Sequence, residues 1–95
     1  SETVFEIAIG LLVVADYSPL TCGCTIIAID VATGAQRWRT RLKAAGIIDH
    51  SLYSNRVNLD IEGNRVIVMG DEWRNYIEVL DLETGRILGR RIVQE

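Results

Sequence analysis

An all-β fold is the architecture that this sequence predicts. Val, Ile and Thr, the β-branched residues that suit a pleated sheet, account for 27 of the 95 residues. Glycines recur where the apolar runs end, and no window keeps a helical apolar stripe over three turns. The length and the apolar content of 48% fit a single domain over residues 1–95.

The first half of the chain is predicted to form four strands. Two apolar runs, 4–9 and 11–16, are separated by Gly10. A third run, 25–30, ends at Asp30. The fourth, 36–42, alternates arginines with Trp38 and Leu42, which is the period-2 pattern of a strand.

The second half repeats this order after a connection over residues 43–54. Its predicted strands are 56–61, 65–70, 76–81 and 86–93. The alignment is clearest where Thr25–Leu42 matches Tyr76–Val93, with Asp30 on Asp81 and a Thr-Gly pair three residues after each Asp. The Asp accepts hydrogen bonds from turn amides, and the Gly supplies a positive φ, so each copy is a hairpin. Upstream, Leu11–Asp16 aligns with Val66–Asp71, and Val4–Ile9 with Val57–Ile61.

The two halves are therefore two four-stranded antiparallel meanders, repeat 1 over about residues 1–45 and repeat 2 over about 52–95. Ala28, Asp30, Gly34 and Trp38 have the spacing of an eleven-residue tryptophan-docking motif. In this motif the chain resembles the PQQ-like (quinoprotein-type) β-propeller repeats. The resemblance covers both halves and implies that each meander is a propeller blade.

The resemblance also implies roles for these residues. Trp38 would pack between neighbouring blades beside the turn glycine of an adjacent repeat, with small Ala28 making room and Asp30 holding the turn. The second copy keeps the turn residues Asp81, Thr84 and Gly85. It is degenerate, because Val79 and Gly89 stand where the motif has Ala and Trp.

Charge and hydropathy limit the partners. A net charge of -3 argues against a general nucleic-acid binder. The longest apolar stretch, Ile7–Ala15, is too short for a bilayer, which needs about 20 residues. The segment before it is acidic, unlike the start of a signal peptide, so cytoplasm and periplasm both stay open.

No catalytic constellation is recognisable, and we predict neither enzyme activity nor a cofactor or metal. Cys22 and Cys24 lack the second ligand pair of a structural zinc site, and we expect them in a loop or edge strand. His50 is the single histidine and lies in the connecting segment, between Asp49 and Ser51. Three such residues adjacent in the sequence do not make a catalytic triad, which is defined by the positions of the side chains in space.

A candidate interaction surface comprises Arg37, Arg39, Arg41 and Trp73. The three arginines alternate and are expected on one strand face, either as a charged edge that discourages aggregation or as a docking face for acidic groups. Trp73 is expected in a turn, where an aromatic side chain can contact a partner.

Three functions stay open on these grounds. The first is a non-catalytic propeller-like module for protein interaction or scaffolding. The others are a fragment of a PQQ-dependent dehydrogenase and an oligomer that binds a small molecule.

Runs such as Ile26–Ile29 and Val66–Met69 are apolar at consecutive positions, so both faces of each sheet need burial. Two blades do not close a propeller. The chain is therefore a piece of a longer propeller, a two-sheet sandwich, or a protein that self-associates. We expect self-association, most simply a dimer through a sheet flank or edge strands; three or four chains would give six or eight blades.

Overall fold

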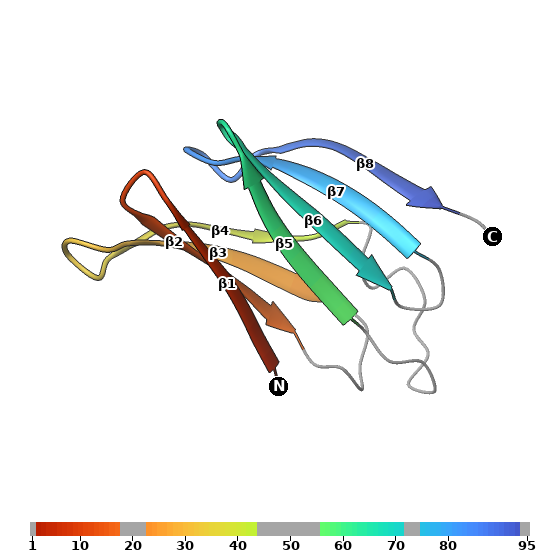
Figure 1. Cartoon of the computed structure of the whole chain (residues 1–95), viewed down its shortest axis with the longest axis horizontal. Helices are drawn as coiled ribbons and strands as arrows, with labels where there is room; N and C mark the ends of the chain where they lie inside the picture. The colour runs from red at the N-terminus through yellow and green to blue at the C-terminus, as the bar shows by residue number, and fades with distance from the viewer. Residues whose placement is uncertain (1, 18–22, 44–55, 72–74, 94–95) are drawn as a thin grey trace.

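The computed structural model describes residues 2–17, 23–43, 56–71 and 75–93. They form two four-stranded antiparallel meanders, which confirms the predicted fold class (Figure 1). Sheet A has the order β1-β2-β3-β4, and sheet B the order β5-β6-β7-β8. The strands are β1 (Glu2–Ala8), β2 (Leu11–Tyr17), β3 (Cys24–Asp30), β4 (Gln36–Arg41), β5 (Arg56–Glu62), β6 (Arg65–Asp71), β7 (Asn75–Asp81) and β8 (Ile87–Val93). Within this described part, no helix is long and apolar enough to cross a membrane.

Strand β1 ends one residue earlier than the sequence predicts. Residue 9 was expected in the strand, but β1 ends at Ala8 and Ile9 lies in the turn with a φ of 50°. Gly10 follows with a φ of 73°. Positive φ at both central residues gives a two-residue hairpin the twist of its strands, so the turn geometry overrides the strand preference of Ile9.

The two Asp-to-Gly turns match in the backbone hydrogen bonds that close them. Asp30 N donates to Ala35 O at 2.8 Å, and Asp81 N donates to Arg86 O at the same distance. The amides of Gly34 and Gly85 donate back to the Asp carbonyls at 2.7 and 2.8 Å. Each hairpin then has a β-bulge at the same place, between residues 28 and 29 in sheet A and between 79 and 80 in sheet B. The internal repeat is therefore a repeat of local structure as well as of sequence.

Outside these hairpins, the sequence alignment of the repeats is wrong by one residue. Register pairs Leu11 with Asp30 and Arg65 with Asp81, so Leu11 corresponds to Arg65 and not to Val66. Between β1 and β5 the alignment is also wrong by one residue but in the opposite direction, because the register places Val4 on Asn58 and not on Val57. A one-residue shift moves every side chain to the opposite face. The apolar pattern did not reveal the register because β2 and β6 are apolar at consecutive positions.

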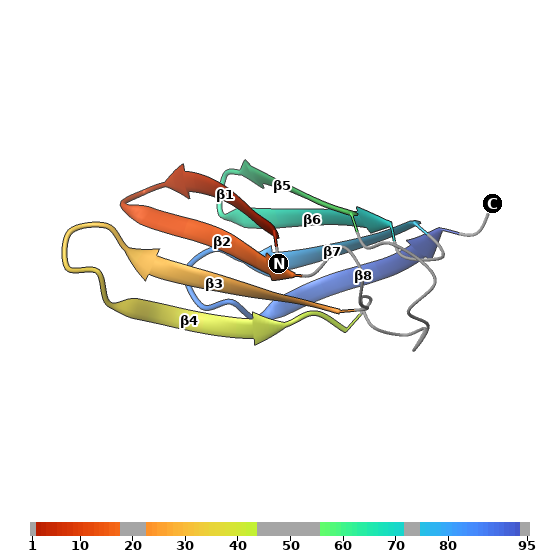
Figure 2. The same ribbon diagram turned by 90° about the horizontal axis from the view of Figure 1, so that it is seen from below.

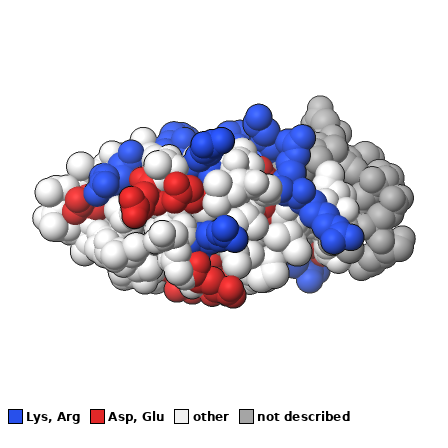
Figure 3. Space-filling model, turned by 90° about the horizontal axis from the view of Figure 1, so that it is seen from above, with Lys and Arg blue, Asp and Glu red and all other residues white. Residues whose placement is uncertain are grey.

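The two sheets pack face to face, with β1 beside β5 (Figure 2). Alternate residues of both sheets fill the space between them and form one buried cluster: Leu11, Val13, Ala15, Tyr17, Cys24, Ile26, Ala28, Trp38, Leu42, Val57, Leu59, Val66, Val68, Tyr76, Leu80 and Leu82. Each sheet covers only one face of the other. Seen from above, basic side chains lie along the upper edge of the molecule and at one place near its middle, acidic ones gather at the left and at the lower edge, and uncharged surface lies between these groups (Figure 3).

Replacing Ile9 by Asn is expected to stabilise the protein by about 1 kcal/mol, because Asn adopts a positive φ more readily than a β-branched residue. Urea denaturation measures the difference. Ile7→Asn is the control: Ile7 is similarly exposed but lies in extended β1, where Asn is unfavourable. A gain of the same size in both variants would show that backbone strain at Ile9 is not its cause.

Candidate functional site

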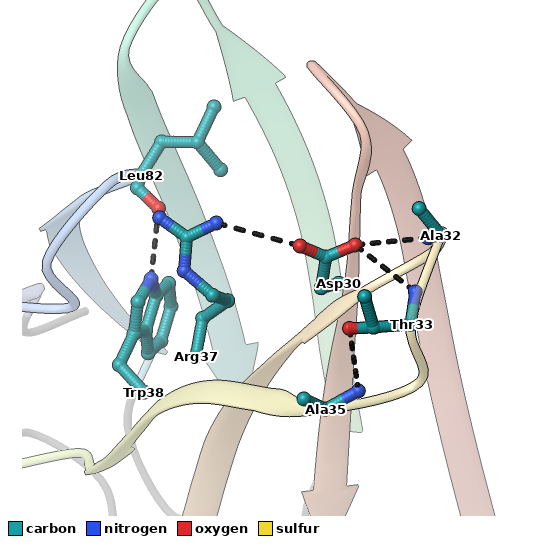
Figure 4. A network of polar contacts seen from close by, with 7 residues as sticks. All are labelled: Asp30, Ala32, Thr33, Ala35, Arg37, Trp38 and Leu82. Carbon is teal, nitrogen blue, oxygen red and sulfur yellow. Dashed lines mark hydrogen bonds and ion pairs between the residues drawn. The ribbon is translucent and has the colours of Figure 1, made fainter.

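The candidate site is the contact between β4 and the Asp81–Arg86 turn of the other sheet. Trp38 pairs across the sheet with Ala28, whose small side chain leaves the indole free to lie toward sheet B. The indole Nε1–H donates to the carbonyl of Leu82 at 2.8 Å (Figure 4). A Cβ atom at Gly85 would collide with the indole ring, so the turn accepts Trp38 only because residue 85 is glycine.

Three further hydrogen bonds join β4 and the residues just after it to sheet B. The Thr40 hydroxyl donates to the carbonyl of Gly85 at 2.6 Å. The backbone amide of Lys43 donates to both carboxylate oxygens of Glu78, at 2.9 and 3.0 Å. All three donors thus come from β4 or the residues just after it, and all three acceptors from sheet B. This pattern fixes the position of sheet B along β4 as well as its orientation.

Glu78 is the functional residue that sequence reasoning missed. It lies in β7 between the buried residues Tyr76 and Leu80 and is itself fully buried. A buried carboxylate needs hydrogen bonds to offset its desolvation, and the Lys43 amide supplies them. The signal was present in the sequence, since Glu78 breaks an otherwise apolar strand at the position where repeat 1 has Ile27.

The Asp residues hold their turns by accepting amide hydrogen bonds. Asp30 Oδ1 accepts from the amides of Ala32 and Thr33, at 2.9 and 3.3 Å (Figure 4). In the second turn, Asp81 accepts from the Glu83 amide at 3.2 Å and from the Thr84 hydroxyl at 3.0 Å. Both turns therefore keep the shape that presents their glycine and the carbonyl beside it.

Each sheet has two unlike faces, which we name by their roles in this contact. The docking face carries Trp38 in sheet A and its counterpart Gly89 in sheet B. The receiving face carries Glu78 in sheet B and its counterpart Ile27 in sheet A. Rows of paired residues across the strands define the faces. The docking rows are Glu6, Val13, Ala28 and Trp38 in sheet A, and Asp60, Ile67, Val79 and Gly89 in sheet B. The receiving rows are Phe5, Val14, Ile27 and Arg39 in sheet A, and Leu59, Val68, Glu78 and Arg90 in sheet B.

The docking face of sheet A therefore packs on the receiving face of sheet B. In a sandwich with two-fold symmetry, corresponding faces would meet; here unlike faces meet, which is the heterologous type of contact. It leaves the receiving face of sheet A and the docking face of sheet B uncovered. The packing thus leaves two unlike surfaces uncovered. The receiving face of sheet A corresponds to the covered face of sheet B, and the docking face of sheet B corresponds to the covered face of sheet A.

Exposure differs accordingly between corresponding residues of the two receiving faces. Leu59 is 8% exposed, whereas its counterpart Phe5 is 61% exposed. Leu82 is fully buried under Trp38, whereas its counterpart Val31 is 56% exposed. A Cβ atom at Gly85 would strike the indole, but one at Gly34 would meet nothing within 4 Å. The turn of sheet A thus presents the same docking position without an occupant among the described residues.

The uncovered docking face of sheet B is hollowed where its tryptophan would stand. A cavity of about 260 Å³ is lined by Ile77, Val79, Gly89, Arg90 and Arg91. A second hollow of about 410 Å³ lies further along the same sheet, near Asn58, Met69 and Tyr76, and both hollows are open to solvent. The first hollow follows from the absence of a side chain at Gly89, opposite Val79 in the register.

The predicted arginine surface is only partly continuous. Arg39 and Arg41 lie opposite Ile27 and Thr25, on the receiving face of sheet A. Arg37 is the extra residue of the bulge, and its guanidinium lies 3.7 Å from the Asp30 carboxylate. Strict alternation did not predict this, because the bulge interrupts the period.

Other candidate residues fall in different places. Cys24 is buried at the start of β3, which is an inner strand and not the expected loop or edge strand. Trp73, Cys22 and His50 lie outside the described residues. Among the residues that are described, no three His, Cys, Asp or Glu side chains are grouped as metal ligands would be.

Comparisons with known proteins do not assign the chain to a family. No model of a known protein family matches the chain, and none of the curated proteins searched matches it. The resemblance to PQQ-like repeats therefore stays a prediction from the motif residues.

Two glycine substitutions test the docking contact as a matched pair. Gly34 and Gly85 have φ values of 76° and 75°, so an alanine at either position carries the same backbone cost of about 1–2 kcal/mol. Only Gly85→Ala also collides, with the Trp38 indole and with the Thr40 hydroxyl, and we expect it to cost a further amount of about 1–3 kcal/mol, measured by chemical denaturation.

The control is to repeat the pair in a Trp38→Ala background. That substitution is itself expected to cost about 3–5 kcal/mol, because the indole is buried. Without the indole, the extra cost of Gly85→Ala over Gly34→Ala should fall to the part that comes from Thr40, whose Oγ1 would lie 2.8 Å from the added Cβ. An extra cost that is undiminished in the Trp38→Ala background would contradict the docking role of Trp38.

Proposed function

We propose that this chain is a non-catalytic β-propeller-like repeat module whose function is to bind other β-sheets through its sheet faces, as a scaffold or interaction module. The observation that carries the proposal is the pair of unlike faces left uncovered by the packing of sheet A on sheet B. Both are rich in apolar residues on regular sheet, and neither is covered by another described element. Exposed apolar patches of this kind are typical of protein–protein interaction sites.

The composition of the two faces supports a protein partner. The receiving face of sheet A exposes Phe5 and Ile7, and Leu12, Val14, Ile27 and Ile29 lie behind them on the same face, partly buried. The docking face of sheet B exposes Met69 beside partly buried Ile67, Ile77 and Val79. Broad apolar surfaces of regular sheet are suited to pack on another sheet, whose side chains would fill a shallow hollow such as the one at Gly89.

We expect self-association in solution. Light scattering at micromolar concentration should give at least twice the chain mass of 10.6 kDa. The control measurement is titration with PQQ, which should change neither the mass of the protein nor the absorbance spectrum of the quinone. A folded, soluble monomer at every concentration would contradict the proposal. A stoichiometric quinone complex with dehydrogenase activity would favour a fragment of a PQQ-dependent dehydrogenase instead.

A further inference from the structure

The two uncovered faces of this chain are counterparts of the two faces that it already joins. Sheet A binds sheet B through a docking face on a receiving face. What remains exposed is one receiving face, on sheet A, and one docking face, on sheet B. A single chain therefore carries both halves of one more contact of the same kind.

We infer that the partner is a second copy of this chain, bound head to tail, with the docking face of sheet B in one copy packed on the receiving face of sheet A in the next. This inference rests on the proposed function and assigns its partner and its direction. The contact continues the internal one: Phe5 takes the place of Leu59, and the turn at Gly34 takes the place of the turn at Gly85.

Corresponding positions also indicate how the second contact differs from the first. Gly89 stands where Trp38 stands, so the docking face of sheet B offers a hollow and not an indole. Val31 stands where Leu82 stands, and it is exposed beside the free turn at Gly34. In the head-to-tail arrangement, Val31 of one copy faces the hollow at Gly89 of the other. Without the indole hydrogen bond, this contact is weaker than the internal one.

The direction of the contact excludes a simple symmetric dimer. A two-fold dimer joins the same patch on both copies, whereas a head-to-tail contact leaves one free face on each end. Such a contact builds a ring when its rotation closes, and an open row of sheets when it does not. The expected dimer of the sequence prediction is thus the first step of this assembly and not its end point.

Complementary face variants test the inference. In Phe5→Glu/Ile7→Glu the receiving face of sheet A carries two charges, and in Met69→Glu/Ile77→Glu the docking face of sheet B does. In a head-to-tail contact each variant blocks its own assembly, so each alone should be monomeric in light scattering. Their equimolar mixture should form a complex of one chain of each, because one good face remains on each partner.

Each other result has a defined meaning. If the wild type is monomeric as well, the proposed function fails together with the inference. If the wild type associates but the Met69→Glu/Ile77→Glu variant still self-associates, the contact is a symmetric one between receiving faces and the inference is overturned. A mixture that stays monomeric, while the wild type associates, overturns it also.

A gain-of-affinity variant guards against loss of folding in the charged variants. A Cβ atom at Gly89 meets nothing within 4 Å, and Gly89 is not among the glycines with a positive φ, so a side chain starts there without a backbone clash. A thermal melt of Gly89→Trp checks that the variant is folded. The variant supplies the missing indole to the docking position at Gly34, and we expect the dissociation constant of the assembly to fall by about tenfold or more. An unchanged or raised dissociation constant in the folded variant would overturn the inference. Gly89→Trp combined with Phe5→Glu/Ile7→Glu is the control and should not associate.

Discussion

The contact between the Trp38 indole and the turn that contains Gly85 determines how the two sheets are placed. The indole is the largest side chain buried between them, and its N–H finds the carbonyl of Leu82 at 2.8 Å. The turn has room for it only because residue 85 has no Cβ atom, and a positive φ makes glycine the natural residue there. One aromatic ring thus couples β4 of sheet A to the hairpin of sheet B, which lies more than forty residues away in the chain.

From this contact follows the sense of packing. Thr40 and the amide of Lys43 continue it along β4, and Glu78 is buried to accept from that amide. A carboxylate on the buried face of β7 is expensive unless it is hydrogen-bonded, so it also disfavours other placements of sheet B. The packing joins unlike faces, and two apolar faces are left over. Their exposure, and hence the proposed binding of further sheets, is a consequence of the same contact.

Much of the fold was predictable from local patterns. The β-branched bias, the turn residues Asp30 and Gly34, and their counterparts Asp81 and Gly85 gave eight strands in two meanders, each within two residues of its bounds in the structure. The alignment of β2 on β6 was not predictable, because both strands are apolar on both faces and either alignment buries the same kind of residue. The partner of Glu78 is a backbone amide of the other sheet, and the bulge at Arg37 depends on the hydrogen-bond register within its hairpin; the alternation of residue types specifies neither.

The most direct test of this account is the NMR environment of the two turn glycines. Gly85 lies against the six-membered ring of Trp38, so its α-protons should be shifted by the ring current, whereas those of Gly34 should not. The indole N–H should exchange slowly with solvent, because its hydrogen bond to Leu82 is buried. Trp38→Leu should abolish the difference between the glycines. Equal α-proton shifts at Gly34 and Gly85 in the wild type, together with a rapidly exchanging indole N–H, would contradict the packing of unlike sheet faces on which the account depends.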